Sequence, residues 1–292
     1  MLRYEGPIYR PPSEAESLLV QATMGCPHNK CTFCMVYKEG PHFKIRPTVD
    51  ICEDMDWAAQ EYGPFVTTVF FPAGNSIAMK TEDLSRICRY AHRVFPNLQR
   101  ITIYGSAQYI ESKGLAEMRQ LAEAGLARIH VGLESGDNEV LNAVCKGASR
   151  QQQIEAGQIV MAAGIELSLY VLLGIGGRER SHAHALATAS ALNAIQPTFI
   201  RLRTLLPKKH TPLLDDIRAG RFQLLGPHEV LRETRKIVEA LEVQSELASD
   251  HYTNYINVHG VLPEDQSQIL TEIDNALQWD ESSFRPVYIG NQ

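Results

Sequence analysis

Short apolar segments rich in β-branched and aromatic residues alternate along this chain with segments of helical periodicity. The two kinds of segment recur together at intervals of roughly thirty residues, the length of one βα repeat with its loops. The apolar segments predict strands at residues 17–23, 67–71, 100–105, 128–133, 166–173 and 199–205. The periodic segments between them predict helices at residues 49–61, 81–94, 112–124, 151–163 and 181–194.

Local signals at the ends of these helices support the assignment. Ser149 and Gln152 have the spacing of a capping box at a helix start. Gly125 and Gly164 follow predicted helices at the position where a left-handed residue is expected.

The order of these elements predicts an α/β fold. Consecutive βα units with no linker between them indicate a partial (β/α)6 TIM-like barrel, followed by a C-terminal helical extension. We expect the barrel and its N-terminal lead-in at residues 1–213, and an extension packing on or over the barrel mouth at residues 214–292. In such a barrel the loops after the strands converge on one face, so residues distant in sequence can meet there.

Composition and charge narrow the class of protein. The chain has 292 residues, 44% hydrophobic and 21% charged, so it can bury a full core. No apolar run reaches the roughly eighteen residues that a membrane span needs, and the polar, proline-rich start does not resemble a signal peptide. We therefore expect a cytoplasmic protein with no membrane partner. A formal net charge of −6 offers no attractive field to a phosphate backbone, so a nucleic-acid partner is not favoured.

Cysteines are clustered on one short loop after the first predicted strand, at Cys26, Cys31 and Cys34. Three thiolates can hold a metal or an iron–sulfur cluster, and they leave one iron open where an electron-transfer cluster takes four cysteines. A zinc site completed by His28 or His42 is the alternative. The other cysteines stand alone on predicted helices, where we expect small buried hydrophobic side chains: Cys52, Cys88 and Cys145.

The cysteine loop resembles the cluster-binding motif of the radical S-adenosylmethionine (SAM) superfamily. In that family, SAM chelates the open iron of a [4Fe-4S] cluster. The commonest family spacing has three residues between the first two cysteines, whereas this chain has four, residues 27–30. The resemblance covers about residues 18–213 and implies that Cys26, Cys31 and Cys34 are the cluster ligands.

Residues 131–136, Val-Gly-Leu-Glu-Ser-Gly, look like a segment of one branch of this superfamily. That branch includes the oxygen-independent coproporphyrinogen oxidases, the methylthiotransferases and the Elp3-type proteins. The resemblance implies SAM-binding roles for Glu134, which would face the ribose, and for Ser135. Lys146 stands where the branch carries a basic residue that meets the SAM carboxylate.

Two glycine-containing loops resemble further SAM-binding segments of the family. Residues 71–76 occupy the place of a glycine-rich motif that contacts the methionyl amine, which implies contacts from Gly74 and Asn75. The segment around Gly174 resembles the one that packs on the adenine. Glycine permits close backbone approach, although ordinary turns use the same residues.

Charged and polar residues of the last predicted strand and the tail are candidates for substrate binding. Arg201 and Arg203 are two residues apart, so a strand places them on the same side, where they can bind a carboxylate or phosphate or be salt-bridged internally. The tail concentrates imidazole and amide groups at His251, Asn254 and His259, which we interpret as a lid or substrate wall rather than a structural plug.

The resemblance implies an enzyme that reductively cleaves SAM at a [4Fe-4S] cluster and directs a 5′-deoxyadenosyl radical at a substrate. A second cysteine set, an RNA-binding domain and room for an acetyltransferase domain are all lacking, so a small or modest-sized substrate is expected. SAM and a reductant such as flavodoxin or ferredoxin are the implied partners. Two alternatives stay open: an RNA-modifying radical SAM enzyme, and a zinc-binding interaction protein on a degenerate barrel.

Overall fold

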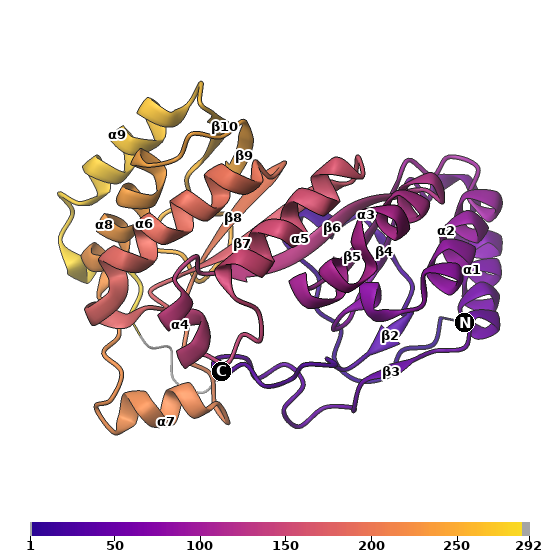
Figure 1. Ribbon diagram of the computed structural model, residues 1–292, viewed down its shortest axis with the longest axis horizontal. Coiled ribbons are helices and arrows are strands. Elements are labelled where there is room, and N and C mark those ends of the chain that lie inside the picture. The colour runs from indigo at the N-terminus through magenta and orange to yellow at the C-terminus, as the bar shows by residue number, and fades with distance from the viewer. Residues whose placement is uncertain (1, 288–292) are drawn as a thin grey trace. The chain divides into compact units, whose positions relative to one another are not determined.

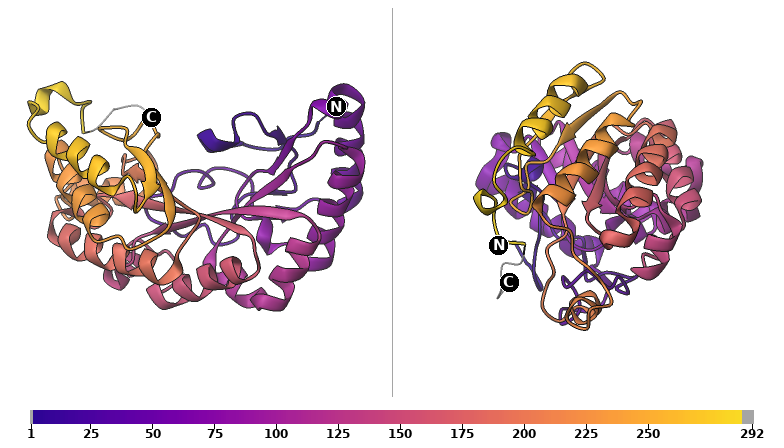
Figure 2. Two further views of the ribbon diagram at one scale, coloured as in Figure 1. Left: turned by 90° about the horizontal axis from the view of Figure 1, so that it is seen from above. Right: turned by 90° about the vertical axis from the view of Figure 1, so that its left-hand side faces the viewer.

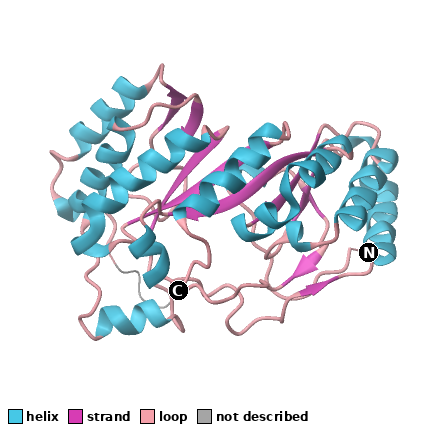
Figure 3. Ribbon diagram, in the orientation of Figure 1, coloured by secondary structure: helices cyan, strands magenta, loops and turns pink. Residues whose placement is uncertain are grey.

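The computed structural model describes residues 2–287, whose helices and strands are drawn in Figure 1 and coloured by type in Figure 3. The packing of the backbone divides the chain into two compact units. The first unit comprises Met1–Asn29, Val36–Val131 and Gln158–Leu167, and the second Lys30–Met35, Gly132–Gly157 and Ser168–Gln292.

The first unit holds a parallel sheet in the order β1-β4-β5-β6 and a separate antiparallel pair, β2 with β3. Its helices α1, α2 and α3 lie along one side of the sheet (Figure 2). Its elements are η1 Pro12–Glu14, β1 Leu18–Leu19, β2 Thr23–Met24, β3 Lys44–Ile45, α1 Thr48–Tyr62, η2 Gly63–Phe65, β4 Thr68–Phe71, η3 Ser76–Ala78, α2 Thr81–Val94, β5 Arg100–Gly105, α3 Ala107–Glu123 and the first part of β6 Leu126–Glu134.

The second unit holds strands in the order β7-β8-β9-β10. The β7–β8 and β8–β9 pairs are parallel and the β9–β10 pair is antiparallel, so residues beyond 213 add strands to this sheet. The predicted domain boundary at residue 213 stays a prediction. The elements are the end of β6, α4 Asn138–Ala143, the start of α5 Arg150–Ala162, β7 Glu166–Leu173, α6 Gly177–Ile195, β8 Phe199–Thr204, α7 Pro212–Arg218, α8 Pro227–Glu239, β9 Ser245–Ala248, β10 His259–Leu262, α9 Gln266–Ala276 and η4 Glu281–Ser283.

The alternating strands and helices agree with the sequence prediction. Residues 81–94, 100–105 and 166–173 have the predicted bounds. The predicted first strand is instead two very short strands, β1 and β2. Helix α3 begins five residues before its predicted start and contains a break at Gly114, whose φ is +66°. The sequence prediction missed β9, β10, α4 and α7, which are short.

The predicted helix ends are also present. The backbone N–H of Ser149 donates to Oε1 of Gln152 at 3.0 Å, and that of Gln152 donates to Oγ of Ser149 at 3.3 Å, which completes the capping box. Gly125 and Gly164 have φ values of +98° and +77°, the left-handed conformation in which glycine is preferred. No helix within residues 2–287 is long and apolar enough to cross a membrane.

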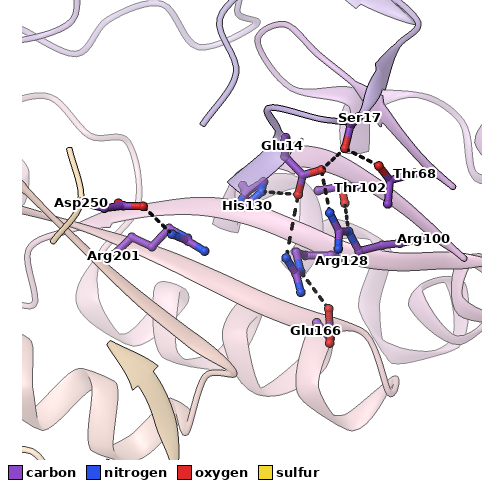
Figure 4. Close-up of polar contacts among 10 residues, drawn as sticks. All are labelled: Glu14, Ser17, Thr68, Arg100, Thr102, Arg128, His130, Glu166, Arg201 and Asp250. Carbon is purple, nitrogen blue, oxygen red and sulfur yellow. Dashed lines mark hydrogen bonds and ion pairs between the residues drawn. The ribbon is translucent and has the colours of Figure 1, made fainter. Parts of the chain in front are cut away.

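In the first unit, the buried carboxylate of Glu14 contacts basic side chains of β5 and β6 (Figure 4). Glu14 is fully buried, and its Oε1 lies 3.3 Å from Nε2 of His130 and 3.9 Å from Nη1 of Arg128. Its Oε2 accepts from Arg100 at 3.2 Å and from the Ser17 hydroxyl at 2.6 Å. Burial alone would raise the pKa of Glu14, but its hydrogen bonds to His130 and Ser17 and the charge of Arg100 lower it to about 2.

Candidate functional site

The cysteine loop begins at a glycine that packs tightly against the chain. Gly25 has a φ of +67°, and a Cβ there would lie 2.6 Å from the carbonyl oxygen of Pro41. Sγ of Cys26 accepts from the backbone N–H of Asn29 at 3.5 Å, and the Asn29 amide donates to the carbonyl of Tyr37 at 2.8 Å. The start of the loop is thus held within the first unit.

Cys31 and Cys34 lie on a turn in the second unit. The backbone N–H of Cys34 donates to the carbonyl of Cys31 at 3.4 Å. Between them, Thr32 donates to the carbonyl of Val144 at 3.0 Å and accepts from the backbone N–H of Leu213 at 3.1 Å. This turn is therefore fastened on both sides by backbone hydrogen bonds.

The chemistry of the loop thiols suits a metal cluster. Cys26, Cys31 and Cys34 form no disulfide and are partly exposed, which is compatible with ligation of a partly accessible cluster. Within residues 2–287, no three His, Cys, Asp or Glu side chains are gathered as they are around a bound metal ion, so ligation stays a prediction. Cys88 is buried and its pKa is raised to about 12 by burial, whereas Cys145 is exposed, contrary to expectation.

Glu134 and Lys146 form an ion pair in the second unit, with Oε1 and Nζ 3.0 Å apart and both side chains 15% exposed. Glu134 ends β6 with a φ of +61°, an uncommon conformation for a residue other than glycine and one that concentrates at functional sites. Burial opposes the charge of Lys146, but the negative charges of Glu134, Cys31 and Cys34 outweigh it and raise the pKa of Lys146.

Gly132 makes room for this pair. A Cβ at Gly132 would lie 2.1 Å from Oε1 of Glu134 and 2.9 Å from Nζ of Lys146. Both distances are too short for real atoms, so a larger residue at this position would require the flexible ends of Glu134 and Lys146 to shift. The glycine at the start of the Gly-Leu-Glu-Ser-Gly segment therefore has a steric reason that sequence analysis did not identify.

The loop after β4 packs on the beginning of the cysteine loop within the first unit. A Cβ at Gly74 would lie 1.6 Å from the carbonyl oxygen of Gly25, so only glycine fits. The backbone N–H of Gly74 donates to the Tyr37 hydroxyl at 2.9 Å. Asn75 is 2% exposed and donates to Oγ of Ser106 at 2.9 Å, while its Oδ1 has no hydrogen-bond partner among the described residues. Such a buried acceptor is suited to a ligand amine.

Ser135 and Gly174 are joined by a buried network in the second unit. The Ser135 hydroxyl lies 2.8 Å from Nδ1 of His184, and Nε2 of His184 lies 3.6 Å from Oε1 of Glu233. That same Oε1 accepts from the backbone N–H of Gly174 at 2.6 Å, and Ser181 donates to the other oxygen. His184 and Glu233 were missed by the sequence analysis.

Of the two missed residues, His184 is neutral at pH 7 and Glu233 is only partly ionised. Burial raises the pKa of Glu233 to about 7 and lowers that of His184 to about 4. Their contact is therefore not a strong ion pair. A signal for Glu233 exists in the sequence, because it shares the buried face of α8 with Val230 and Ile237 at helical spacing.

The profile of the Radical SAM superfamily matches residues 20–188, more than half of the chain. The chain belongs to the radical SAM superfamily. The matched range contains the loop cysteines, Glu134 and Lys146. Members of this superfamily bind a [4Fe-4S] cluster and SAM and use an external reductant. A search of curated protein sequences found no match.

Solved radical SAM structures share the fold of this chain. The methyltransferase TsrM from Kitasatospora setae, with cobalamin and a [4Fe-4S] cluster bound, has a TM-score of 0.58 and 19% identity over 70% of this chain and 39% of its own. Methylornithine synthase has a TM-score of 0.55 and 14% identity over 91% of this chain and 83% of its own. Coproporphyrinogen III oxidase from Escherichia coli has a TM-score of 0.56 and 15% identity over 76% of this chain and 52% of its own. The chain thus spans well under half of TsrM and about half of the oxidase, and the predicted α/β partial-barrel fold is confirmed.

Glu233 gives this radical SAM chain a testable pH dependence. Its folded-state pKa of about 7 exceeds the ordinary 4.5, so its contribution is complete below pH 4.5 and is lost as pH rises through 7. We expect Glu233→Gln, which keeps an acceptor for Gly174, to gain up to about 3 kcal/mol relative to wild type between pH 5 and pH 8. Urea unfolding at the two pH values measures this gain. The matched control is Glu239→Gln, an exposed change on the same helix, and equal pH slopes for wild type and Glu233→Gln would contradict the prediction.

The side chain of Asn254 forms hydrogen bonds to backbone groups within the protein. Its Oδ1 accepts from the backbone N–H of Thr204 at 2.7 Å. Its amide group donates to the carbonyls of Leu202 and Ser249 at 2.9 and 2.8 Å. These bonds hold the tail segment against the end of β8, which favours a structural role for Asn254. A substrate contact stays a prediction.

The remaining candidates differ in their surroundings. Arg201 is buried and Arg203 is exposed. Arg203 donates to Nε2 of His251 at 3.1 Å, so the structure brings these two predicted residues together. His259 is exposed on β10 and lies 3.2 Å from Oε1 of Glu246, a surface contact that indicates no ligand.

Proposed function

We propose that this chain binds a [4Fe-4S] cluster through Cys26, Cys31 and Cys34 and uses SAM to activate a small-molecule substrate. Membership of the radical SAM superfamily and three partly exposed thiols that form no disulfide support this function. The family relationship favours a cluster over the alternative zinc site. When bound, the cluster and SAM supply a 5′-deoxyadenosyl radical that removes hydrogen from an unactivated carbon.

The observation that carries the proposal is the Glu134–Lys146 pair. The negative charges of Glu134, Cys31 and Cys34 raise the pKa of Lys146 against the effect of burial. The ammonium group of Lys146 would hold the SAM carboxylate, and Glu134 would accept from a ribose hydroxyl. The left-handed backbone at Glu134 directs this carboxylate at the end of its strand.

The loop after β4 would supply polar groups for the methionyl end of SAM. Gly74 keeps the loop after β4 close to Gly25, the residue that precedes Cys26. Oδ1 of Asn75 would accept from the SAM amine. These groups orient the ligand, and the buried side chains around them limit the access of water.

The proposed substrate class rests on the net charge of the chain, and the proposed reductant rests on the family. A net charge of −6 favours a small molecule over a nucleic acid. The electron would come from a protein such as flavodoxin or ferredoxin. We place the protein in the cytoplasm, where the thiols of the loop stay reduced.

The SAM site can be tested without the natural substrate. Anaerobically purified protein with dithionite should release 5′-deoxyadenosine from SAM, measured by chromatography. Lys146→Met should weaken SAM binding about tenfold or more in a calorimetric titration, because a charge-assisted contact is lost, while the cluster absorbance is retained.

The matched control is Glu139→Gln, which changes a 72% exposed carboxylate of the same unit. It should bind SAM like wild type. Wild-type affinity in Lys146→Met would contradict the assignment of the SAM site. Colourless protein that carries zinc would contradict the proposed function as a whole.

A further inference from the structure

One face of the second unit's sheet carries polar and aromatic side chains. The register pairs Tyr170 of β7 with Arg201 of β8, and Arg201 with Ala248 of β9. Arg203 lies two residues on, on the same side. The guanidinium carbon of Arg201 lies 5.8 Å from the ring centroid of Phe199, and that of Arg203 lies 5.9 Å from Tyr170. These contacts confirm that both arginines project from one face.

The opposite face is aliphatic. Leu169, Val171, Ile200, Leu202 and Leu247 are at most 2% exposed. Helices α6, α8 and α9 lie to one side of these strands (Figure 2). A buried charge on the arginine-bearing face costs free energy unless an anion compensates it.

Arg201 is incompletely compensated within the protein. The residue is 7% exposed, and its ion pair is with Asp250, where Nη1 and Oδ2 are 3.7 Å apart (Figure 4). The carboxylate of Asp250 is 40% exposed, so solvent weakens this interaction. Nε of Arg201 is buried and has no hydrogen-bond partner among the described residues. A buried guanidinium normally satisfies that donor.

Arg203 is held by a neutral partner. Burial and the positive charges of Arg203 and Lys208 lower the pKa of His251 to about 4, so its imidazole is uncharged at pH 7 and accepts from Arg203 at 3.1 Å. Nδ1 of His251 lies 2.8 Å from the hydroxyl of Thr253, which fixes the ring. Within residues 2–287, Arg203 has no carboxylate partner. His251 thus orients this guanidinium without cancelling its charge.

We propose that Arg201 and Arg203 bind a carboxylate of the substrate, so that the enzyme acts on a carboxylate-bearing small molecule. This inference rests on the proposed function. A guanidinium can bind a carboxylate bidentately, and two of them on one strand face add positive charge for the same anion. Ala248, next to Arg201 in the register, adds no charge to this face. Glu246 of β9 is paired with Phe199 in the register, and its side chain contacts His259.

Succinate is a simple probe of this site in the anaerobically purified full-length protein. Calorimetric titration should show binding of succinate, weaker binding of inorganic phosphate, and none of the neutral analogue succinamide. Arg201→Gln should weaken succinate binding about tenfold or more, and Arg203→Gln several-fold, because charged donors are lost. Arg201→Lys keeps the charge without the fork and should fall between wild type and Arg201→Gln.

Arg221→Gln is the matched control, since Arg221 is an exposed arginine of the same unit bound to Asp216. It should leave succinate affinity unchanged. If Arg201→Gln does not fold, Arg203→Gln and Arg201→Lys decide. Wild-type succinate affinity in both, tighter binding of phosphate, or no binding of succinate to wild type would overturn the proposal. SAM cleavage in the same preparation is independent of succinate, so the two proposals fail separately.

Discussion

Cys31→Ala protein, purified and reconstituted anaerobically, is expected to lack the brown colour and visible absorbance of a [4Fe-4S] cluster. The family's cluster is held by three cysteines, so loss of one thiolate leaves too few ligands. Cys26→Ala and Cys34→Ala should behave alike. Iron and sulfide analysis, with the absorbance spectrum, measures the effect.

Cys52→Ala is the matched control for cluster loss. Cys52 is a free, partly buried thiol on α1, and burial raises its pKa, which disfavours the thiolate that a metal needs. This variant should load its cluster fully, and so should Cys145→Ala. Full loading of Cys31→Ala would show that the loop cysteines are not the ligand set.

Replacement of Glu14 by Gln should cost about 3 kcal/mol of unfolding free energy at pH 7. The change removes the charge while leaving Arg100, Arg128 and His130 around a side chain that is fully buried. Breaking a buried ionic cluster on one side is costly because the remaining charges stay desolvated. Urea unfolding of both proteins measures the loss.

The pH dependence separates this ionic effect from loss of packing. The folded pKa of Glu14 is about 2 and the ordinary value 4.5, so its stabilisation is present above pH 4.5 and is lost as pH falls toward 2. The difference between wild type and Glu14→Gln should therefore shrink over that range. Glu16→Gln, an exposed change two residues away, should match wild type, and a pH-independent difference for Glu14→Gln would refute the ionic explanation.

The sequence predicted the main strands and helices because they bury continuous apolar faces. Residues 100–105 and 166–173 are such strands, and their bounds agree with the structure. Strands β9 and β10 were missed because both are short and contain polar or small residues, such as Glu246 and Gly260. Their pairing depends on β8, a contact that local periodicity does not record.

Sequence analysis identified the candidate site residues that belong to a recognisable motif. It missed those whose position depends on how the helices pack. The loop cysteines, Glu134 and Lys146 stand out through spacing and resemblance. His184 and Glu233 lie on helices and reach Ser135 and Gly174 only after folding.

Strand periodicity correctly placed Arg201 and Arg203 on one side of β8. It could not show that Arg201 is buried and Arg203 exposed. Nor could it show that Arg201 meets Asp250 and Arg203 meets His251, contacts that form only in the folded chain.

The space beside Gly132 also constrains how this sequence can diverge. A Cβ there would lie 2.1 Å from Oε1 of Glu134 and 2.9 Å from Nζ of Lys146, so the geometry of this ion pair depends on the residue at position 132. Alanine at position 132 can be accommodated by a shift of these flexible ends. A homologue with alanine there can therefore keep both charged residues, but their ion pair would have a different geometry.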